Sequence, residues 1–136
     1  MTTPLYALLF FVAWTLSILM GVAYFRVSSV LRKEARASSF PGGVAPGNDL
    51  YSRFIRAHLN CVENLPLFGA VVLVGHVAQV ESTLFSGISV AYIAARVGQT
   101  LAHLWSAREL AVNIRFGFFC LQVGFLFAMI LTILAA

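Results

Sequence analysis

Residues 53–68 read R-F-I-R-A-H-L-N-C-V-E-N-L-P-L-F, a mostly apolar stretch that includes Arg56, Asn60 and Glu63. These three residues are spaced i, i+4 and i+7, so a helix places them on one face. An arginine, an amide and a carboxylate have no reason to line up in a hydrophobic helix unless something polar meets them there. The stretch therefore predicts a helix with a polar stripe, a name kept below for Arg56, Asn60 and Glu63.

The composition around the polar stripe indicates an integral membrane protein. The chain has 136 residues, of which 60% are hydrophobic and 10% are charged, and its mean hydropathy is +0.90. Soluble domains carry roughly 25% charged residues. Residues 5–25 form an uncharged run long enough to cross about 30 Å of hydrocarbon. The N-terminus lacks the positive region of a signal peptide, so this run is expected to remain as a span.

The apolar runs predict four membrane-spanning helices in one all-α domain over residues 1–136. Charged residues follow the first run, so its helix is expected to extend past the membrane surface. Residues 38–49, rich in proline and glycine, predict a loop, and Asn48 or Asp49 is a candidate N-cap for the second helix. Pro66 is expected to kink that helix. The later helices are expected at residues 50–79, at residues 84–105 and from near Asn113 to the C-terminus.

All nine basic residues lie in or beside the first-to-second and third-to-fourth connections. Four spans place both connections on one side, which the positive-inside rule predicts to be cytoplasmic, with both termini on the other side. The net charge of +4 would suggest nucleic acid in a soluble protein, but two clusters that flank spans form no basic face. Nucleic-acid binding is therefore disfavoured. The small size and short connections favour a bacterial inner membrane.

The cysteines, histidines and tryptophans indicate neither a metal site nor a disulfide framework, and His103 is either a packing residue or a ligand contact. Cys61 and Cys120 lie inside apolar segments without the spacing of a disulfide framework, and the three histidines match no zinc motif. Trp105, at the end of the third helix, is expected to be an interfacial anchor. Trp14, in the middle of the first span, is expected to pack between helices.

A second group of polar residues lies in the third helix, where Arg96, Gln99 and His103 are spaced i, i+3 and i+7. The first interpretation is an internal salt-bridge network that sets the register of the second and third helices. The second is a polar pocket that opens to the basic side. Arginines outnumber the one carboxylate, Glu63, and unpaired buried charge is costly, so this pocket would bind an anionic guest. Because Glu63 could accept an ammonium group, a carboxylate-rich zwitterion fits.

The motif R-A-H-L-N-C-V-E-N-L-P-L-F resembles the second-helix signature R-A-x-x-N-x-x-E-x-x-P-x-F of the MAPEG family, the membrane-associated proteins in eicosanoid and glutathione metabolism. The segment A-R-V-G-Q-T-L-A-H is similar to that family's A-R-x-x-(H/Y)-x-x-x-Y, and the fourth helix opens with an arginine in both. The resemblance covers essentially the whole chain. It implies a homotrimer of four-helix bundles that binds glutathione between neighbouring subunits near the cytoplasmic face.

The resemblance also implies roles for individual residues. Gln99 stands where the family has His or Tyr, and His103 stands where it usually has Tyr. Arg115 matches the fourth-helix arginine thought to stabilise the glutathione thiolate, and Arg108 is a rival because the preceding link is longer here. Arg26 and Arg32 compete for the place of a first-helix arginine that contacts glutathione. The expected glutathione-binding residues are Arg56, Asn60, Glu63, Arg96, Gln99 and His103.

A free thiol has a pKa of about 8.5 and is mostly protonated at neutral pH, but an adjacent guanidinium favours the thiolate nucleophile. We therefore expect Arg115 to be the catalytic residue of a membrane-bound glutathione transferase or peroxidase that acts on hydrophobic electrophiles. One alternative is a member of the same fold that binds glutathione or lipid without turnover. Another is a small transporter, which would more typically show polar residues along a full span or inverted repeats.

Overall fold

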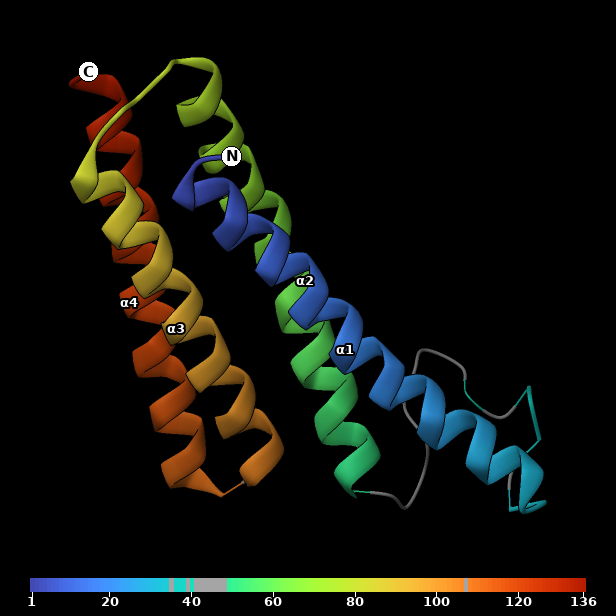
Figure 1. The fold of residues 1–136 in the computed structure, drawn as a ribbon. Helices are drawn as coiled ribbons and strands as arrows, with labels where there is room; N and C mark the ends of the chain where they lie inside the picture. The colour runs from blue at the N-terminus through green and yellow to red at the C-terminus, as the bar shows by residue number, and fades with distance from the viewer. Residues whose placement is uncertain (35, 39, 41–48, 107) are drawn as a thin grey trace.

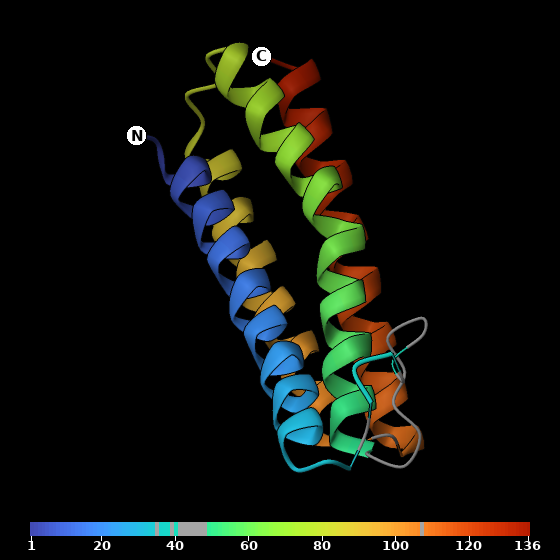
Figure 2. The same cartoon turned by 90° about the vertical axis from the view of Figure 1, so that its right-hand side faces the viewer.

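The computed structural model describes residues 1–34, 36–38, 40, 49–106 and 108–136. These residues form an all-helical bundle in which α1 packs mainly against α2, and α3 mainly against α4 (Figure 1). The side view shows that α1 and α4 lie at opposite corners (Figure 2). The helices are α1 (Thr3–Leu31), α2 (Asp49–Val77), α3 (Thr83–Trp105) and α4 (Glu109–Leu134).

The two basic connections lie at one end of the bundle, as predicted from the sequence. Both termini and the α2–α3 connection lie at the other end (Figure 1). We refer below to the basic end and the opposite end of the bundle. The predicted all-α fold is therefore confirmed, with both arginine-rich connections at one end of the bundle.

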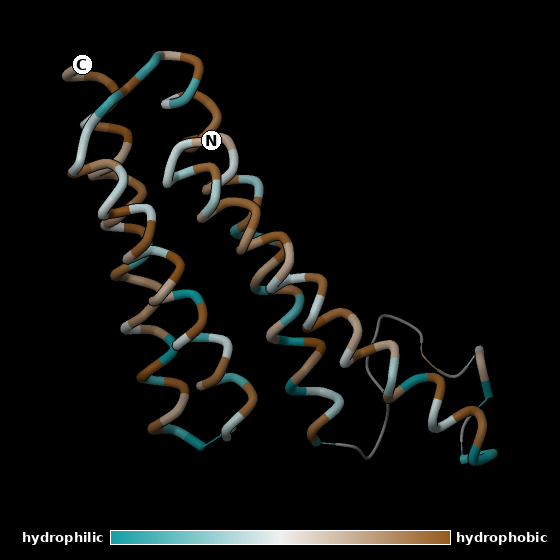
Figure 3. The backbone as a smooth tube through the Cα atoms, viewed as in Figure 1, coloured by the Kyte–Doolittle hydropathy of each residue, from teal (hydrophilic) through white to brown (hydrophobic). Residues whose placement is uncertain are grey.

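Within the described residues, α1, α2 and α4 are long and apolar enough to cross a membrane, and Figure 3 shows hydrophobic residues along most of α1 and α4. The protein is thus an integral membrane protein. Helix α3 does not meet this criterion, because Arg96, Gln99 and His103 lower its hydropathy. Arg96 and Gln99 are buried among the other helices, which allows α3 to lie alongside α4 at the same depth.

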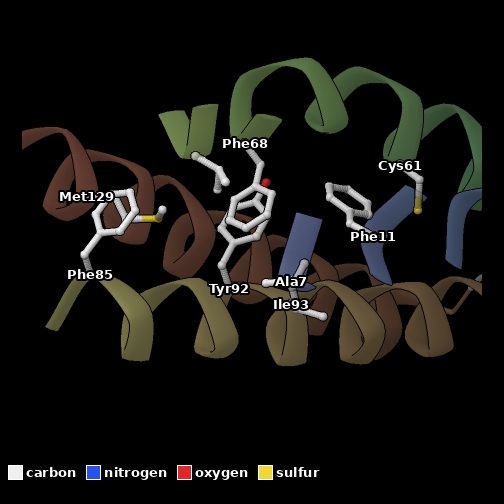
Figure 4. Packing of buried hydrophobic residues seen from close by; sticks show 9 residues of the cluster. Ala7, Phe11, Cys61, Phe68, Phe85, Tyr92, Ile93 and Met129 are labelled. Atoms are coloured by element: carbon white, nitrogen blue, oxygen red, sulfur yellow. The ribbon is translucent and has the colours of Figure 1, made fainter. Parts of the chain in front are cut away.

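The core is built from side chains of all four helices (Figure 4). The rings of Phe68 and Tyr92 stack with centroids 4.4 Å apart and planes 6° apart, and Phe11 meets Phe68 edge-on at 6.0 Å. Lipid is as apolar as these side chains, so close packing rather than exclusion of water holds the helices together. The cluster comprises Ala7, Phe11, Cys61, Phe68, Val72, Phe85, Tyr92, Ile93 and Met129.

Helices α1 and α2 end in the same way, with one residue in the left-handed region. Lys33 has φ 57° and Gln79 has φ 55°. After α2, the amide of Val80 donates to the carbonyl of Gly75 at 3.0 Å and that of Gln79 to His76 at 3.1 Å, which is the Schellman pattern. Helix α2 therefore ends at Val77, two residues before the predicted boundary. The sequence did not mark this helix end, because glutamine occupies the left-handed position at which glycine is usual.

The second and fourth helices begin at residues other than those predicted. Asp49 is the first residue of α2 rather than its N-cap, and Asn48 lies outside the described residues with most of the predicted loop. Helix α2 is continuous through Pro66, and the predicted kink stays a prediction. The fourth helix begins at Glu109, earlier than the Asn113 expected, because an acidic residue suits the first turn of a helix.

Trp14 packs between helices as predicted, and the anchor role of Trp105 stays a prediction. The indole nitrogen of Trp14 on α1 donates to the hydroxyl of Thr100 on α3 at 3.3 Å, so this ring packs between helices. Trp105 is 64% exposed at the basic end of α3, which suits an interfacial anchor.

Arg53 joins the start of α2 to the end of α3. Its Nη1 donates to the carbonyls of Leu104 at 2.6 Å and Trp105 at 2.9 Å, and its Nη2 lies 3.1 Å from a carboxylate oxygen of Asp49. The last carbonyls of a helix lack partners within the helix and carry partial negative charge. The guanidinium supplies both the missing donors and the complementary charge.

We expect Arg53→Gln to lower the free energy of unfolding by about 1–3 kcal/mol, because it removes charged hydrogen bonds to two terminal carbonyls. The measurement is thermal unfolding of the detergent-purified protein. Arg32→Gln is the matched control, since Arg32 is exposed at the C-cap of α1. Equal melting temperatures for the two variants would show that the Arg53 contacts contribute nothing.

Candidate functional site

The polar stripe lies on the outside of the single bundle. Arg56 and Glu63 are exposed and Asn60 is half-buried. Glu63 is near the middle of α2, about 20 Å along the helix axis from its first residue. A charged side chain at the centre of a bilayer costs roughly 2.5–3.5 kcal/mol by insertion measurements. Something other than lipid is therefore expected to cover this face.

Arg96 lies directly behind the polar stripe and is completely buried. Its Nη1 donates to the side-chain oxygen of Asn60 and, at 2.7 Å, to that of Gln99. Its guanidinium carbon lies 5.6 Å from the centre of the Phe11 ring and 5.9 Å from that of Tyr92. In the described part of the chain, Nε and Nη2 have no hydrogen-bond partner. Arg96 is thus a buried cation whose donors are only partly used.

Among the residues that the structure describes, Arg56, Glu63 and Arg96 form no internal salt-bridge network. An ion pair within 4.0 Å joins Arg53 to Asp49 at the basic end. Glu63 pairs with neither Arg56 nor Arg96 within those ranges. Within the described ranges, Arg56 and Arg96 therefore have no carboxylate as a counter-charge.

The contact with Arg96 also orients the amide of Asn60. Arginine has only donors, so the oxygen of the Asn60 amide faces inward and its nitrogen is directed away. No hydrogen bond from this nitrogen is formed within the described residues. The backbone carbonyl of Asn60 accepts from the Asn64 side chain at 2.8 Å. Asn60 therefore keeps amide N–H donors for a group outside the single chain.

Gln99 has both ends of its amide engaged inside the bundle. Its oxygen accepts from Arg96 and, at 3.1 Å, from the side chain of Gln122 on α4. Its nitrogen donates to the backbone carbonyl of Arg115 at 3.0 Å. A continuous polar chain thus links α2, α3 and α4 through Asn60, Arg96 and Gln99.

Gln122 was missed in the sequence analysis. It is 1% exposed and contacts Gln99, seven residues after Arg115 on α4. A lone amide in the middle of an otherwise apolar span was the available signal, since polar groups at that depth usually face a partner.

Arg115 and His103 are in direct contact near the basic end. Arg115 Nη1 lies 3.2 Å from His103 Nδ1, and Arg115 Nε donates to the carbonyl of Ala111 at 3.2 Å. Because a guanidinium only donates, Nδ1 accepts and the imidazole carries its hydrogen on Nε2. Arg115 forms no ion pair within the described ranges. Its rival Arg108 is exposed at the N-cap of α4.

The two candidate arginines of α1 differ in their surroundings. Arg26 Nε donates to the hydroxyl of Tyr51 at 2.7 Å, and its guanidinium lies 5.7 Å from the centre of the Phe40 ring. This arginine fastens α1 to the first turn of α2. Arg32 is exposed at the end of α1 and has no contact of this kind in the described residues.

The structure has a cavity at each end of the bundle, and the polar pocket predicted from the sequence stays a prediction. A cavity of about 410 Å³ at the basic end is lined by residues that include Arg53, Trp105 and Arg108. A larger one of about 1000 Å³ lies at the opposite end, between the start of α1 and the α2–α3 connection. Neither is lined by any residue of the polar stripe.

The fold and these side chains define a class: a helical integral membrane protein with charges on an outward face at membrane depth and an unneutralised arginine behind them. The model of the MAPEG family matches residues 4–135, nearly the whole chain, and the protein belongs to that family. No curated protein and no solved structure matches it. Membership confirms the resemblance drawn from the second-helix motif, in a family that includes glutathione transferases and related proteins.

Proposed function

We propose that this protein is a membrane-bound glutathione transferase or peroxidase that works as a homotrimer, with glutathione bound between neighbouring subunits. The observation that carries the proposal is the unneutralised Arg96 behind an exposed polar stripe. A second copy against this face would remove Arg56 and Glu63 from lipid and would enclose a polar pocket over the stripe. An anionic guest would then supply the missing negative charge.

Glutathione suits the chemistry of the polar stripe. It carries two carboxylates, one ammonium group and one thiol. The planar fork of Arg56 suits a carboxylate, and Glu63 can accept the ammonium group. The Asn60 amide, with its nitrogen directed away from Arg96, can donate to a further oxygen. Arg96 adds positive potential from behind without having to touch the guest.

The proposed chemical step uses Arg115 as the catalytic residue. Its guanidinium, which has no ion pair in the described residues, favours the glutathione thiolate over the thiol, whose proton passes to water. The sulfur then attacks an electrophilic carbon delivered from the bilayer. With a chlorinated nitrobenzene, the S–C bond forms, the C–Cl bond breaks and chloride leaves with the electron pair. On this proposal the basic end faces the cytoplasm, with a bacterial inner membrane as the setting.

The test is a calorimetric titration of the detergent-purified protein with reduced glutathione, followed by a turnover assay with a chlorinated nitrobenzene. Binding with turnover is the expected result. Binding without turnover would favour the non-catalytic alternative of the same fold. Absence of binding would remove the glutathione proposal and leave a MAPEG bundle with another role.

We expect Glu63→Gln to weaken glutathione binding about tenfold, or about 1.4 kcal/mol, because the neutral amide no longer attracts the ammonium group. The dissociation constant from calorimetry is the measurement. Glu81→Gln is the matched control, since Glu81 is exposed in the α2–α3 connection at the opposite end and should bind normally. If Glu63→Gln changed the melting temperature and left the affinity intact, the carboxylate would be a structural partner.

A further inference from the structure

We infer that Gln99 and Gln122 are positioning residues that hold Arg115 in place for thiolate stabilisation. This inference rests on the proposed function. It begins from the burial of the two amides, which are 2% and 1% exposed. A buried amide that is hydrogen-bonded at both ends, as Gln99 is, stabilises one arrangement of the helices around it, because leaving such a group unpaired is costly. Gln122 contributes through its nitrogen, since its oxygen has no partner among the described residues.

The hydrogen bonds of Gln99 act on the backbone of Arg115 itself. Its amide nitrogen donates to the Arg115 carbonyl at 3.0 Å, across the α3–α4 interface. Its amide oxygen is held by Arg96 at 2.7 Å and by Gln122 at 3.1 Å, so the amide cannot rotate without breaking three contacts. Gln99 thus has its oxygen and one of its two amide N–H donors engaged within the chain. This differs from the ligand contact that the family resemblance implies for its position.

Helix packing beside Gln99 holds α4 in the same register. A Cβ atom at Gly98 would lie 2.7 Å from the ring of Phe118, so the missing side chain lets this ring approach the α3 backbone. Phe118 lies one helical turn after Arg115, and Gln122 lies one turn further. The ring and the two glutamines thus secure α4 over the two turns that follow Arg115.

The position of the Arg115 guanidinium depends on this register. Its Nε bonds to the carbonyl of Ala111 on the same helix, and its Nη1 bonds to His103 on α3. A shift of α4 along α3 would carry Arg115 and Ala111 along together and would break the contact between Arg115 and His103. Misplacement of a reacting group by about 1 Å can cost about 100-fold in rate. A glutamine that never touches glutathione can thereby control the thiolate.

The test compares wild type, Gln99→Met and Gln99→His. Methionine removes the amide at similar volume, whereas neutral histidine retains one donor and one acceptor. We expect Gln99→Met to reduce kcat at least tenfold with less than a threefold change in the KM for glutathione. The ultraviolet absorbance of the bound thiolate should fall at the same pH. Gln99→His should restore both kcat and the thiolate signal.

Gln122→Met removes one donor to Gln99 and is expected to cause a smaller loss of thiolate, about threefold, in a protein that melts normally. It serves as the second variant if Gln99→Met does not fold. An unchanged thiolate signal in the variants, beside an active wild type, would overturn the positioning role alone. A parallel loss of glutathione affinity and rate in Gln99→Met would instead make Gln99 a ligand contact. A wild type that neither binds glutathione nor turns over would overturn the proposed function and this inference with it.

Discussion

Arg115→Ala is expected to reduce turnover at least about tenfold, a loss of about 1.4 kcal/mol in transition-state stabilisation, while leaving much of the glutathione affinity. The arginine has no ion pair among the described residues and contacts His103. Its free charge can therefore act on a developing thiolate. Since the polar stripe supplies the groups for binding, removal of Arg115 should affect kcat far more than the dissociation constant.

Arg108→Ala is the matched control, because this rival arginine is exposed at the N-cap of α4 and lines a separate cavity. It should leave turnover unchanged. Turnover assays and calorimetry on both variants separate chemistry from binding. Normal turnover in Arg115→Ala would remove this residue from the mechanism, and a loss confined to Arg108→Ala would transfer the role to the rival.

Arg96→Met is expected to weaken glutathione binding at least about tenfold, or about 1.4 kcal/mol, while the melting temperature stays the same or rises. The buried guanidinium has no counter-charge and leaves Nε and Nη2 without partners in the described chain. Replacing buried charges by apolar residues is often neutral or stabilising by about 1–4 kcal/mol. Binding should suffer because the positive potential behind Asn60 is lost and its amide is no longer oriented.

Arg53→Gln provides the contrast, since Arg53 has its donors satisfied by the end of α3 and should lose stability without losing glutathione affinity. Thermal unfolding and calorimetry are measured on both variants. We expect Arg96→Met to lose affinity at an unchanged or higher melting temperature, and Arg53→Gln to lose stability at an unchanged affinity. A sharp fall in the melting temperature of Arg96→Met with binding intact would make Arg96 a purely structural residue.

The fold could be predicted largely because lipid imposes simple rules. Long apolar runs, with arginines confined to two connections, predict a helical bundle with both connections at one end, and the structure has this arrangement. Helix ends were less predictable. The αL positions at Lys33 and Gln79 carry ordinary side chains, so no glycine marks them. Glu109 was assigned to a polar link because a helical first turn and a loop can share the same composition.

The candidate site could be predicted only where spacing along one helix was enough. The i, i+4, i+7 pattern of Arg56, Asn60 and Glu63 indicated one face, and the structure adds that this face points outward. The environment of Arg96 depends on Asn60 from α2 and on the rings of Phe11 and Tyr92 from other turns and helices. Such contacts between helices leave no periodic signal in one sequence.

The roles of Gln99 and Gln122 could not be predicted either, because they depend on contacts between helices. Gln99 belonged to the predicted ligand-binding set by its place in the third-helix motif. In the structure its amide oxygen accepts from Arg96 and Gln122, and its nitrogen donates to the Arg115 carbonyl. Only the packing of α3 against α4 reveals this use, since the bonding residues are separated by 16 and 23 positions in the chain.

The surplus of positive charge around Arg96 and the polar stripe is tested most directly by calorimetry with two related ligands. Reduced glutathione and its diester, in which both carboxylates are neutral, are titrated into the same detergent-purified protein. We predict that glutathione binds and that the diester binds at least about tenfold more weakly, a difference of about 1.4 kcal/mol. Equal affinities, or no binding of either ligand, would contradict a site that is completed by an anionic guest.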